Sequence, residues 1–531
     1  MPNHSLQYIK TGYFSKLICD YLAEKELLKP FYNRFPNLEN FKHQLQEKQK
    51  NVTDDKRHLL AKRILFQYGD NPLSQATLSN IDLLKEKTTF TITTGHQLNL
   101  FTGPLYFLYK IYSTINLSEK LNSEYKTNHF VPVYWMATED HDFEEINYFN
   151  LFGKKVSWGK NVSGAVGEIT TEGLREVEKQ LRKEFGESEN AKKLISYFSK
   201  AYTKHKNLAD ATRYLANTLF QNHGLVIVDG NDPALKKCFI PYAEKELTEN
   251  LSFKKVTETT KKLTDLGFSE QVHPREINLF YLKENLRERI IEQEGRFYIN
   301  ETALAFSKEE ILKELHENPQ RFSPNALLRP LYQEVILPNL CYIGGGGELA
   351  YWFQLKDYFN KVDVPFPILL LRNSVLLVPK ILSGKLKKLN VSIESLFLQQ
   401  HKLMTKHTRE ISTIEIDFSR QKEFLQKQFK DLYNIAKQTD VSFIGAVGAQ
   451  EKKQLNGLDT LEKRLLKAQK RNLSNELDRL KTIQNELFPN QSLQERKLNF
   501  SEFYLEYGED LMNILKENLD PLDLKFTVLE L

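Results

Sequence analysis

The chain has few cysteines and no long apolar run. Its three cysteines, Cys19, Cys238 and Cys341, lie far apart, and none forms a Cys-x-x-Cys pair. This spacing excludes a zinc ribbon or a disulfide framework and is typical of a reducing compartment. No uninterrupted run of about 18 apolar residues occurs that could span a membrane. The first ten residues also lack the apolar core of a signal peptide. We therefore expect a cytoplasmic protein with no membrane partner.

The chain also lacks a strong excess of charge of either sign. It has 74 basic and 69 acidic residues and a net charge of +5, which is too small to predict nucleic-acid binding. Repeats and low-complexity tracts are absent from the sequence as well. Hydrophobic residues make up 40% of the 531 residues, enough for a large buried interior. This length predicts two or three structural units.

Apolar runs alternate with helical patterns between residues 88 and 375. The strand candidates are 88–94, 130–137, 224–229, 335–343 and 366–371. Such alternation predicts an α/β fold with a parallel sheet. The interval 230–330 is too long for one crossover, so we expect an insertion there, with a small antiparallel element near residues 280 and 297. Glycines in 145–170 predict a second small β insertion.

The two ends of the chain differ from this middle part. Residues 1–85 have a polar, helical pattern, and 385–490 is rich in Lys, Gln, Leu and Glu. Leucines recur every seven residues from Leu466 to Leu487, which predicts a coiled-coil seam. With a break at Gly445 and Gly448, we expect a helical hairpin that could self-associate; a helical pair packed on the core is the alternative. The domains are then a catalytic core (1–384), a coiled-coil arm (385–490) and a segment returning to the core (491–531), whose last residues could add a strand to the sheet.

Polar residues follow the first buried strand. Gly95-His96-Gln97 comes directly after it, and a helical pattern follows. Open α/β sheets bind ligands beyond the carboxyl ends of parallel strands. We expect Gly95 to open a helix whose backbone N–H groups receive a polar or anionic group, and His96 to donate a hydrogen bond to the substrate. The further binding candidates are Gln97, Asn99, Thr102 and Gly103. No phosphate-binding fingerprint is present, and a capped turn with a solvent-facing histidine is the alternative.

The second buried strand ends in an acidic cluster, Glu139–Glu145. Asp140 and Asp142 could hold a hard cation or orient an attacking amine, with His141 and Glu144 beside them. Repulsion between neighbouring carboxylates would raise one pKa and give a general base near neutrality. The alternative is a solvated acidic helix start, which the helix dipole favours. We predict His96, Asp140, His141 and Asp142 as the catalytic group, and the sequence leaves a metal open.

A run of four glycines follows the strand candidate 335–343. Glycine permits positive φ and close backbone approach to a ligand, which makes Gly345, Gly346 and Gly347 candidates for binding. The residues after them that could share one helix face towards a pocket are Glu348, Tyr351 and Gln354. Glu348 could bind an ammonium group. A flexible turn before an amphipathic helix is the alternative.

Two arginines lie near other strand ends. Arg329 and Gln333 precede the glycine run, and Arg372 and Asn373 follow the Leu-rich strand. Either arginine could pair with a carboxylate through its planar fork, although each residue could also be purely structural. Together the strand ends predict a pocket of mixed charge, suited to a polar substrate that carries amine and carboxylate groups.

In combination these motifs resemble the BshC family of bacillithiol biosynthesis. The resemblance is carried, in order along essentially the full chain, by Thr94–Tyr106, Pro132–Glu145, the glycine run with Glu348–Gln354, and Ser492–Arg496. It implies a Rossmann-like core related to nucleotidyltransferases, with connecting-peptide insertions and a coiled-coil domain that forms a homodimer. It also implies a cysteine ligase that joins L-cysteine to the amine of glucosaminyl-malate.

Within this resemblance, the malate carboxylates would suit Arg329 or Arg372, and the cysteine amine would suit Glu348 or Asp142. His96 stands where related nucleotidyltransferases carry a His-x-Gly-His-type motif, but this chain has only one histidine there and no Lys-Met-Ser-Lys-Ser-like loop. ATP is therefore a possible activating nucleotide that no motif shows. The residues predicted to contact a nucleotide at a second surface are Gln494, Glu495 and Arg496.

Two other functions stay open. A metal-dependent hydrolase could use the acidic cluster 139–145, and a scaffold protein could use the coiled coil as its binding element. Glycines beside charged strand ends make the scaffold the weakest of the three interpretations. An amide-forming enzyme would need an activated carboxylate, because a free carboxylate is a poor electrophile.

Overall fold

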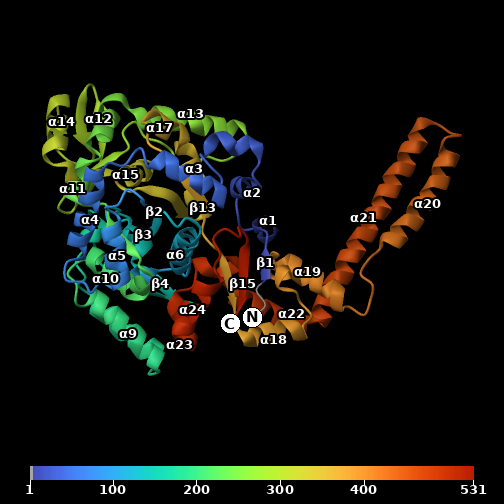
Figure 1. The fold of residues 1–531 in the computed structure, drawn as a ribbon. Coiled ribbons are helices and arrows are strands. Elements are labelled where there is room, and N and C mark those ends of the chain that lie inside the picture. Colours follow the sequence, from blue (N-terminus) through green and yellow to red (C-terminus); the bar gives the residue numbers. More distant parts are fainter. Residues whose placement is uncertain (1–3) are drawn as a thin grey trace.

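A computed structural model describes residues 4–531. It consists of a mixed α/β body and a helical hairpin that projects from it (Figure 1). Among the described residues, no helix combines the length and the apolar character needed to cross a membrane.

A parallel sheet forms the centre of the body. Its five strands are β2 (Thr89–His96), β3 (His129–Met136), β6 (Val226–Asp229), β12 (Asn339–Gly344) and β13 (Ile368–Leu371). They lie in the order β13-β12-β2-β3-β6. Numbered along the chain, this order has the Rossmann pattern, and the direction of the connections reverses between β2 and β12. The predicted α/β fold is confirmed, and the crevice where ligands are expected lies between these two strands.

The strand predictions are correct at four of five places, and the fifth is half wrong. Residues 329–336 form helix α15 (Arg329–Ile336), and β12 begins only at Asn339. Pro330 occupies the first turn of α15, where its missing N–H has no cost. An apolar run of eight or nine residues cannot distinguish a buried helix end from a strand by its pattern alone.

The helix predicted at Gly95 is also wrong. Strand β2 continues through His96, and helix α6 (Tyr106–Glu124) begins ten residues later. Between them, Phe101, Thr102 and Gly103 all have positive φ, which interrupts any helix. A Cβ at Gly103 would lie 2.6 Å from Cβ of Asn99, so this turn requires glycine. The end of β2 therefore offers no helix start to a ligand.

Both predicted insertions are present. Strands β4 (Tyr148–Leu151) and β5 (Lys154–Ser157) form a hairpin. The second insertion is larger than expected, a five-stranded antiparallel sheet in the order β10-β9-β8-β7-β11. Its strands are β7 (Leu279–Lys283), β8 (Leu286–Gln293), β9 (Arg296–Ile299), β10 (Ala305–Phe306) and β11 (Phe322–Pro324).

Helices surround both sheets. The N-terminal region is helical as predicted, with α1 (Tyr8–Thr11), α2 (Lys16–Leu22), α3 (Leu38–Lys48), α4 (Asp54–Tyr68) and α5 (Gln75–Leu83). The helices after β3 are α7 (Phe143–Ile146), α8 (Leu174–Phe185), α9 (Glu189–Tyr202), α10 (Leu208–Phe220), α11 (Pro233–Lys237), α12 (Ile240–Glu249), α13 (Leu251–Asp265) and α14 (Lys308–Glu317). Those after β12 are α16 (Gly346–Trp352), α17 (Lys356–Lys361), α18 (Lys380–Lys388), α23 (Phe500–Tyr507) and α24 (Glu509–Asn518).

The end of the chain forms a strand, but in a separate sheet. Strand β15 (Phe526–Glu530) lies between β1 (His4–Leu6) and β14 (Val375–Val378). It pairs antiparallel with β1 and parallel with β14. The tail therefore returns to the body as predicted, at a place other than the central sheet.

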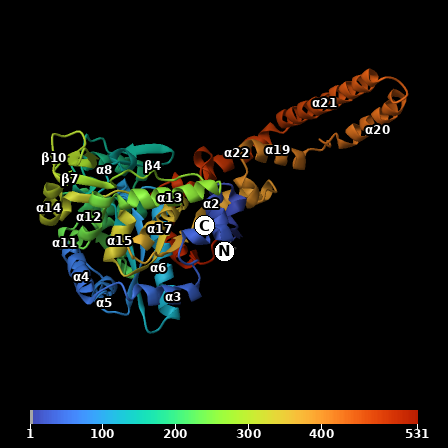
Figure 2. The same cartoon turned by 90° about the horizontal axis from the view of Figure 1, so that it is seen from above.

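The projecting hairpin consists of α20 (Ser419–Ala436) and α21 (Val441–Asn472), which extend well beyond the body (Figure 2). The helices at its base are α19 (Gln400–Ile411) and α22 (Ser474–Leu487). The break predicted at Gly445 and Gly448 is wrong, because both lie inside α21 and the turn comes before it, where Asp440 caps the helix. A glycine costs a helix only about 1 kcal/mol, less than neighbouring contacts can supply.

Candidate active site

A cavity of about 340 Å³ lies at the reversal point between β2 and β12. The lining residues around Lys110 and Glu348, called the α16 side below, are Gly95, His96, Tyr106, Lys110, Arg329, Tyr342, Glu348 and Tyr351. Those around the end of β3, called the β3 side below, are Gln97, Trp135, Met136, Ala137, Thr138, Glu139, Asp140, Arg287, Pro324, Asn325 and Ala326. Three parallel strands thus supply one wall, and the antiparallel insertion supplies Arg287 and residues 324–326 of the other.

The α16 side contains an ion pair in which the lysine is buried, whereas the glutamate side chain is 29% exposed. Lys110, from the apolar side of α6, donates hydrogen bonds to the Glu348 carboxylate and, at 2.7 Å, to the Gly95 carbonyl. The Tyr342 hydroxyl donates to the second Glu348 oxygen at 2.8 Å. Burial raises the pKa of Glu348, but Lys110 and Tyr342 outweigh burial and hold that pKa below its ordinary value. Both oxygens of this ionised carboxylate are therefore already occupied.

Arg329 is a cation of the cavity whose hydrogen-bond partners are neutral. Its guanidinium donates to the Gln333 amide oxygen at 3.0 Å and to the Tyr351 hydroxyl at 3.4 Å. It also lies 5.6 Å from the centre of the Tyr342 ring. No carboxylate within residues 4–531 forms an ion pair with it. An arginine stays charged at any ordinary pH, so this site can receive an anion.

His96 lies at the end of β2 between the rings of Tyr106 and Phe107, 5.5 and 5.0 Å away. Burial, and after it the charge of Lys110, lowers the pKa of His96 well below its ordinary value. The ring is therefore neutral at pH 7. Its Nε2 is buried and has no hydrogen-bond partner among the described residues. A neutral imidazole with one unused nitrogen can accept or donate a single hydrogen bond, but it supplies no positive charge.

The β3 side contains the start of the acidic cluster, of which Glu139 and Asp140 line the cavity. Asp140 accepts hydrogen bonds from the Gln97 amide at 3.0 Å and from the His141 backbone N–H at 2.8 Å. Burial raises the pKa of Asp140. The hydrogen bonds from His141 and Gln97, together with the charge of Arg287, outweigh burial and leave that pKa well below its ordinary value. The expected general base with a raised pKa is therefore not found at Asp140, because neighbouring donors outweigh repulsion between the acids.

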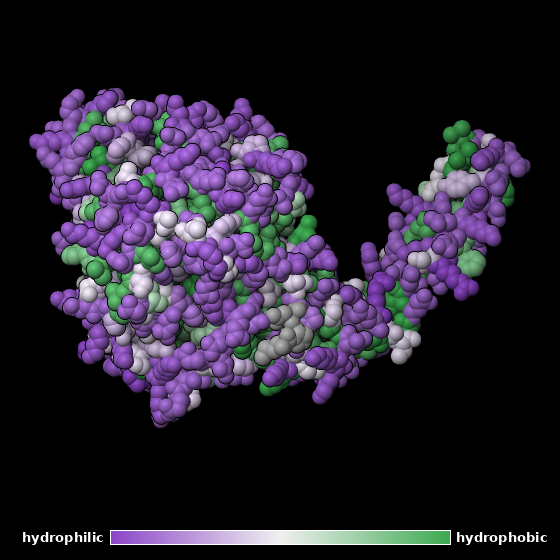
Figure 3. All heavy atoms as spheres, in the orientation of Figure 1, coloured by the Kyte–Doolittle hydropathy of each residue, from purple (hydrophilic) through white to green (hydrophobic). Residues whose placement is uncertain are grey.

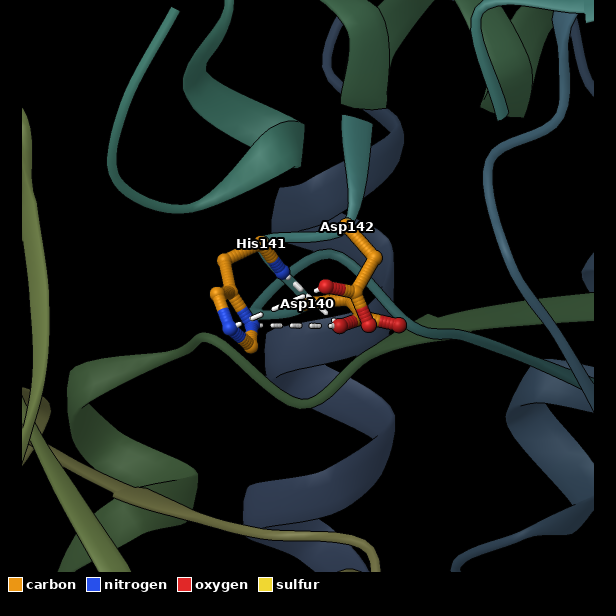
Figure 4. A group of neighbouring side chains, drawn as sticks. All are labelled: Asp140, His141 and Asp142. Carbon is orange, nitrogen blue, oxygen red and sulfur yellow. Dashed lines mark hydrogen bonds and ion pairs between the residues drawn. The ribbon is translucent and has the colours of Figure 1, made fainter. Parts of the chain in front are cut away.

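Asp140, His141 and Asp142 lie close enough to share an ion, with candidate ligand atoms within 4.8 Å of one another (Figure 4). However, His141 Nδ1 lies 2.6 Å from a guanidinium nitrogen of Arg287. Because arginine only donates, this ring nitrogen accepts the hydrogen bond. The same guanidinium stacks on Phe280, 3.9 Å from the ring centre. A cation therefore occupies Nδ1 of His141, while Nε2 lies 3.7 Å from an oxygen of Asp142.

The structure brings together seven of the predicted site residues. Gly95, His96, Gln97, Asp140, Arg329, Glu348 and Tyr351 all line the cavity. Gln333 is buried behind Arg329 and holds it. His141 and Asp142 are exposed beside Asp140, and Glu144 is exposed on α7. The seven lining residues come from four separate segments of the chain, as the convergence of parallel strand ends predicts.

The glycine run differs from its prediction. Gly345 caps α16, and Gly346 and Gly347 form its first turn. None of these glycines has positive φ. The requirement for glycine is steric and falls on Gly344, where a Cβ would lie 2.9 Å from the Tyr342 ring. The run packs α16 closely against β12 and so carries Glu348 to the cavity.

Several predicted ligands have structural roles. Gln354 is buried and binds Thr260 and the backbone of residues 271 and 272. Asn373 is buried and binds Ser113 and the Asp520 carbonyl. Asn99 binds the Glu145 carbonyl, and Thr102 and Gly103 form the left-handed turn. None of these five side chains or glycines is among the residues that line the cavity.

Arg372 and the predicted nucleotide surface also pack internally. Arg372 forms a buried ion pair with Glu495 at 2.7 Å, and its guanidinium lies 5.0 Å from the Tyr106 ring centre. Gln494 exchanges two hydrogen bonds of 3.0 Å with the backbone of Leu377. Because both side chains are buried and occupied, Gln494 and Glu495 join the C-terminal segment to β14 and are not placed to contact a nucleotide. Arg496 is exposed.

Four lining residues were not predicted from the sequence: Lys110, Tyr342, Tyr106 and Arg287. Lys110 interrupts the otherwise apolar pattern of Leu108, Ile111 and Ile115, and a lone lysine on a buried helix face is the signal that could have revealed it. Arg287 lies on an insertion strand, far along the chain from the other lining residues, and nothing in its local sequence distinguishes it.

Comparison with protein families identifies both parts of the chain. The family described as Bacillithiol biosynthesis BshC, N-terminal Rossmann-like domain, matches residues 1–373. The family described as Bacillithiol biosynthesis BshC, C-terminal coiled-coil domain, matches residues 375–531. The chain belongs to the BshC family. The resemblance found in the motifs is thereby confirmed, and so is the combination of a Rossmann-like domain with a coiled coil.

Full-length relatives agree with this assignment. A protein of Christiangramia forsetii named "Putative cysteine ligase BshC" is 57% identical, covering 100% of this chain and 99% of the relative. A protein of the same name from Flavobacterium johnsoniae is 55% identical, with 100% of both chains covered. A more distant one from Bacillus cereus is 27% identical over 97% of this chain and 98% of its own. The similarity thus extends through the body and the hairpin alike.

Proposed function

We propose that this BshC protein is a cysteine ligase that joins L-cysteine to the amine of glucosaminyl-malate. The observation that carries the proposal is the cavity at the reversal point between β2 and β12, which combines an unpaired arginine with an ionised aspartate. The named activity of the relatives supports it. A substrate with carboxylates and an amine matches both kinds of group.

The malate carboxylate binds Arg329. Arg372 is the less suitable of the two predicted arginines, because it is buried and paired with Glu495. Arg329 has only neutral partners within the described chain, so an incoming carboxylate gains a full ion pair. A planar fork also fixes the orientation of a carboxylate, which a lysine does not.

The amine of glucosaminyl-malate binds on the β3 side of the cavity, where Asp140 is ionised and its side chain is 28% exposed. Glu348 is the weaker candidate for this role, because Lys110 and Tyr342 occupy its oxygens. Neutral His96 is available to take a single hydrogen bond from the attacking group. In the reaction the amine nitrogen bonds to the cysteine carboxyl carbon, the bond to the activating group breaks, and the amine releases a proton.

Activation of the cysteine carboxylate requires a co-substrate, and we propose ATP. Mass spectrometry of the full chain with glucosaminyl-malate, cysteine and ATP, each left out in turn, tests the whole proposal. The expected product appears only with all three present. Product formed without ATP would contradict the activation step, and no product in the complete mixture would contradict the ligase function itself.

A metal-dependent hydrolase is the second candidate, because Asp140, His141 and Asp142 can approach one ion together. Arg287 argues against it, since its positive charge lies at Nδ1 of His141 and would repel a metal ion held by Nε2 and the acids. Hydrolysis that depends on a stoichiometric divalent metal would favour this candidate over the ligase.

We also propose that the protein acts as a homodimer joined through α20 and α21, in the cytoplasm. Apolar side chains are exposed along this hairpin, including Phe424, Leu432, Ile435, Phe443 and Leu461. Figure 3 shows apolar patches on the hairpin, far from the body. Exposed apolar side chains gathered on a narrow projection are typical of an association surface.

A further inference from the structure

Lys110 connects the two sides of the crevice in which the cavity lies. Its side chain is 2% exposed, and its Nζ binds the Gly95 carbonyl at the end of β2 and the Glu348 carboxylate in the first turn of α16. These two segments flank the reversal point of the sheet. The Lys110 side chain therefore joins the end of β2 to the first turn of α16 on the α16 side of the cavity.

This lysine still has a donor to offer. An ammonium group has three N–H donors, and Nζ of Lys110 has two hydrogen-bond partners within the part of the chain that the structure describes. Lys110 also lines the cavity itself. Because both partners are acceptors held by the fold, the direction of the ammonium is fixed before any ligand arrives.

We propose that Lys110 donates its third N–H to the oxygen of the cysteine carboxyl group under attack and stabilises the negative charge that develops there. This role rests on the proposed ligase function and adds a catalytic residue to it. Preorganised donors inside a water-excluded site are the most effective means of stabilising such charge. When the amine attacks, electrons move from the carboxyl C=O bond onto that oxygen, and they return when the bond to the activating group breaks.

The chain contains a matched control for this lysine. Lys48, on α3, is 1% exposed and also binds one backbone carbonyl and one carboxylate, both from Glu334, at 2.8 and 3.3 Å. It does not line the cavity. Lys48→Met therefore removes a lysine–carboxylate pair that is more deeply buried than Lys110–Glu348, without removing a donor from the site.

The test compares Lys110→Met, Lys110→Arg, Lys110→Ala and Lys48→Met in the full chain, using glucosaminyl-malate, cysteine and ATP. We expect Lys110→Met to lower kcat about 100-fold or more while each KM changes much less. Lys48→Met is expected to lower the unfolding temperature similarly and to change kcat only slightly. Lys110→Arg keeps the charge and the ion pair but displaces the donor, so kcat falls with little loss of stability.

Chemical rescue separates catalysis from packing. Ethylammonium added to Lys110→Ala should restore part of kcat, whereas it should not affect Lys48→Met. A Lys110→Met or Lys110→Arg variant with wild-type kcat would overturn the inference, as would the absence of any rescue in a folded Lys110→Ala protein. A wild-type protein that forms no product would instead overturn the proposed function, and this role with it.

Discussion

The cavity and the hairpin place their side chains in opposite ways. Around the cavity, charged groups are buried or half-buried and some are paired, as for Lys110 with Glu348 and Arg372 with Glu495. On the hairpin, apolar groups such as Phe424 and Ile435 are exposed, and its own small core contains Phe429, Ala436 and Val447. Burying charge is costly unless it is paired, and exposing large apolar groups is also unfavourable.

The difference indicates two kinds of partner. The cavity is organised for a small polar ligand that adds a partner to its charges, because Arg329 forms hydrogen bonds only to neutral groups. The hairpin is organised for a protein surface that covers apolar side chains. If each region is adapted to its own partner, a substitution in one should leave the property of the other nearly unchanged, which the following predictions test.

The largest effect is expected at Arg329. Arg329→Gln removes the unpaired cation, and two charge-assisted hydrogen bonds to a carboxylate contribute about 3 kcal/mol together, or about 100-fold in kcat/KM. Steady-state kinetics over a range of glucosaminyl-malate concentrations measures this. The dimer, measured by analytical ultracentrifugation, should be unaffected. A variant with unchanged kcat/KM would move the carboxylate site elsewhere.

On the hairpin, the double variant Phe424→Glu with Ile435→Glu should weaken self-association at least about tenfold, because it places charge where apolar surface is covered. Sedimentation at several protein concentrations gives the dissociation constant. The control is Lys427→Glu, on the same helix α20 and with a similar change of charge. If the wild-type chain stays monomeric at all concentrations, the dimer proposal is wrong.

On the β3 side of the cavity, Asp140→Asn should lower kcat/KM about tenfold, since a charge-assisted hydrogen bond to the amine of glucosaminyl-malate becomes a neutral one. Asp142→Asn, on an exposed side chain outside the cavity, serves as the control. Metal analysis of the purified wild type and of the double variant Asp140→Asn with Asp142→Asn belongs to the same experiment. Loss of a stoichiometric divalent ion in the variant would support the hydrolase alternative.

The smallest effect is expected where the C-terminal domain meets the β4–β5 hairpin. Glu502, on α23, accepts a hydrogen bond from the Phe152 N–H at 2.8 Å, and burial raises its pKa from 4.5 to about 7. A raised carboxyl pKa means that the folded protein retains the proton that the unfolded chain loses. Its contribution to stability is therefore present below about pH 4.5 and is lost as the pH rises to about 7.

Glu502→Gln should flatten the dependence of the unfolding temperature on pH between these limits. Thermal unfolding followed by circular dichroism at several pH values measures this. The exposed Glu506 on the same helix is the control position, and Glu506→Gln should leave the slope as it is. An unchanged slope in Glu502→Gln would place the titrating group elsewhere.

The sequence predicted what depends on local pattern. Buried strands appear as apolar runs, and because parallel strands end at one edge, His96, Asp140 and Glu348 could be expected to lie near one another. The apolar neighbours of Lys110 mark it as unusual, but they do not assign it to the site, since its partners Gly95 and Glu348 are brought to it only by packing. The same reason explains Arg372 and Gln494, which look like ligands in sequence but find their partners within the fold.

Conformation at glycines was the least predictable part. Gly445 and Gly448 continue a helix, and Gly346 begins one, because glycine permits irregular backbone without requiring it. The left-handed residues before α6 include Phe101 and Thr102, which no preference of residue type would suggest. Their conformation is fixed from outside, where Asn499 binds the Phe101 and Gly103 carbonyls.

The small sheet of β1, β15 and β14 has a consequence for biosynthesis. Its central strand is β15, so β1 and β14 have no shared neighbour until residues 526–530 have been made. This sheet can therefore close only after residues 526–530 have left the ribosome. Until then β1 and β14 lack the strand that joins them, although every strand of the central sheet has already been made.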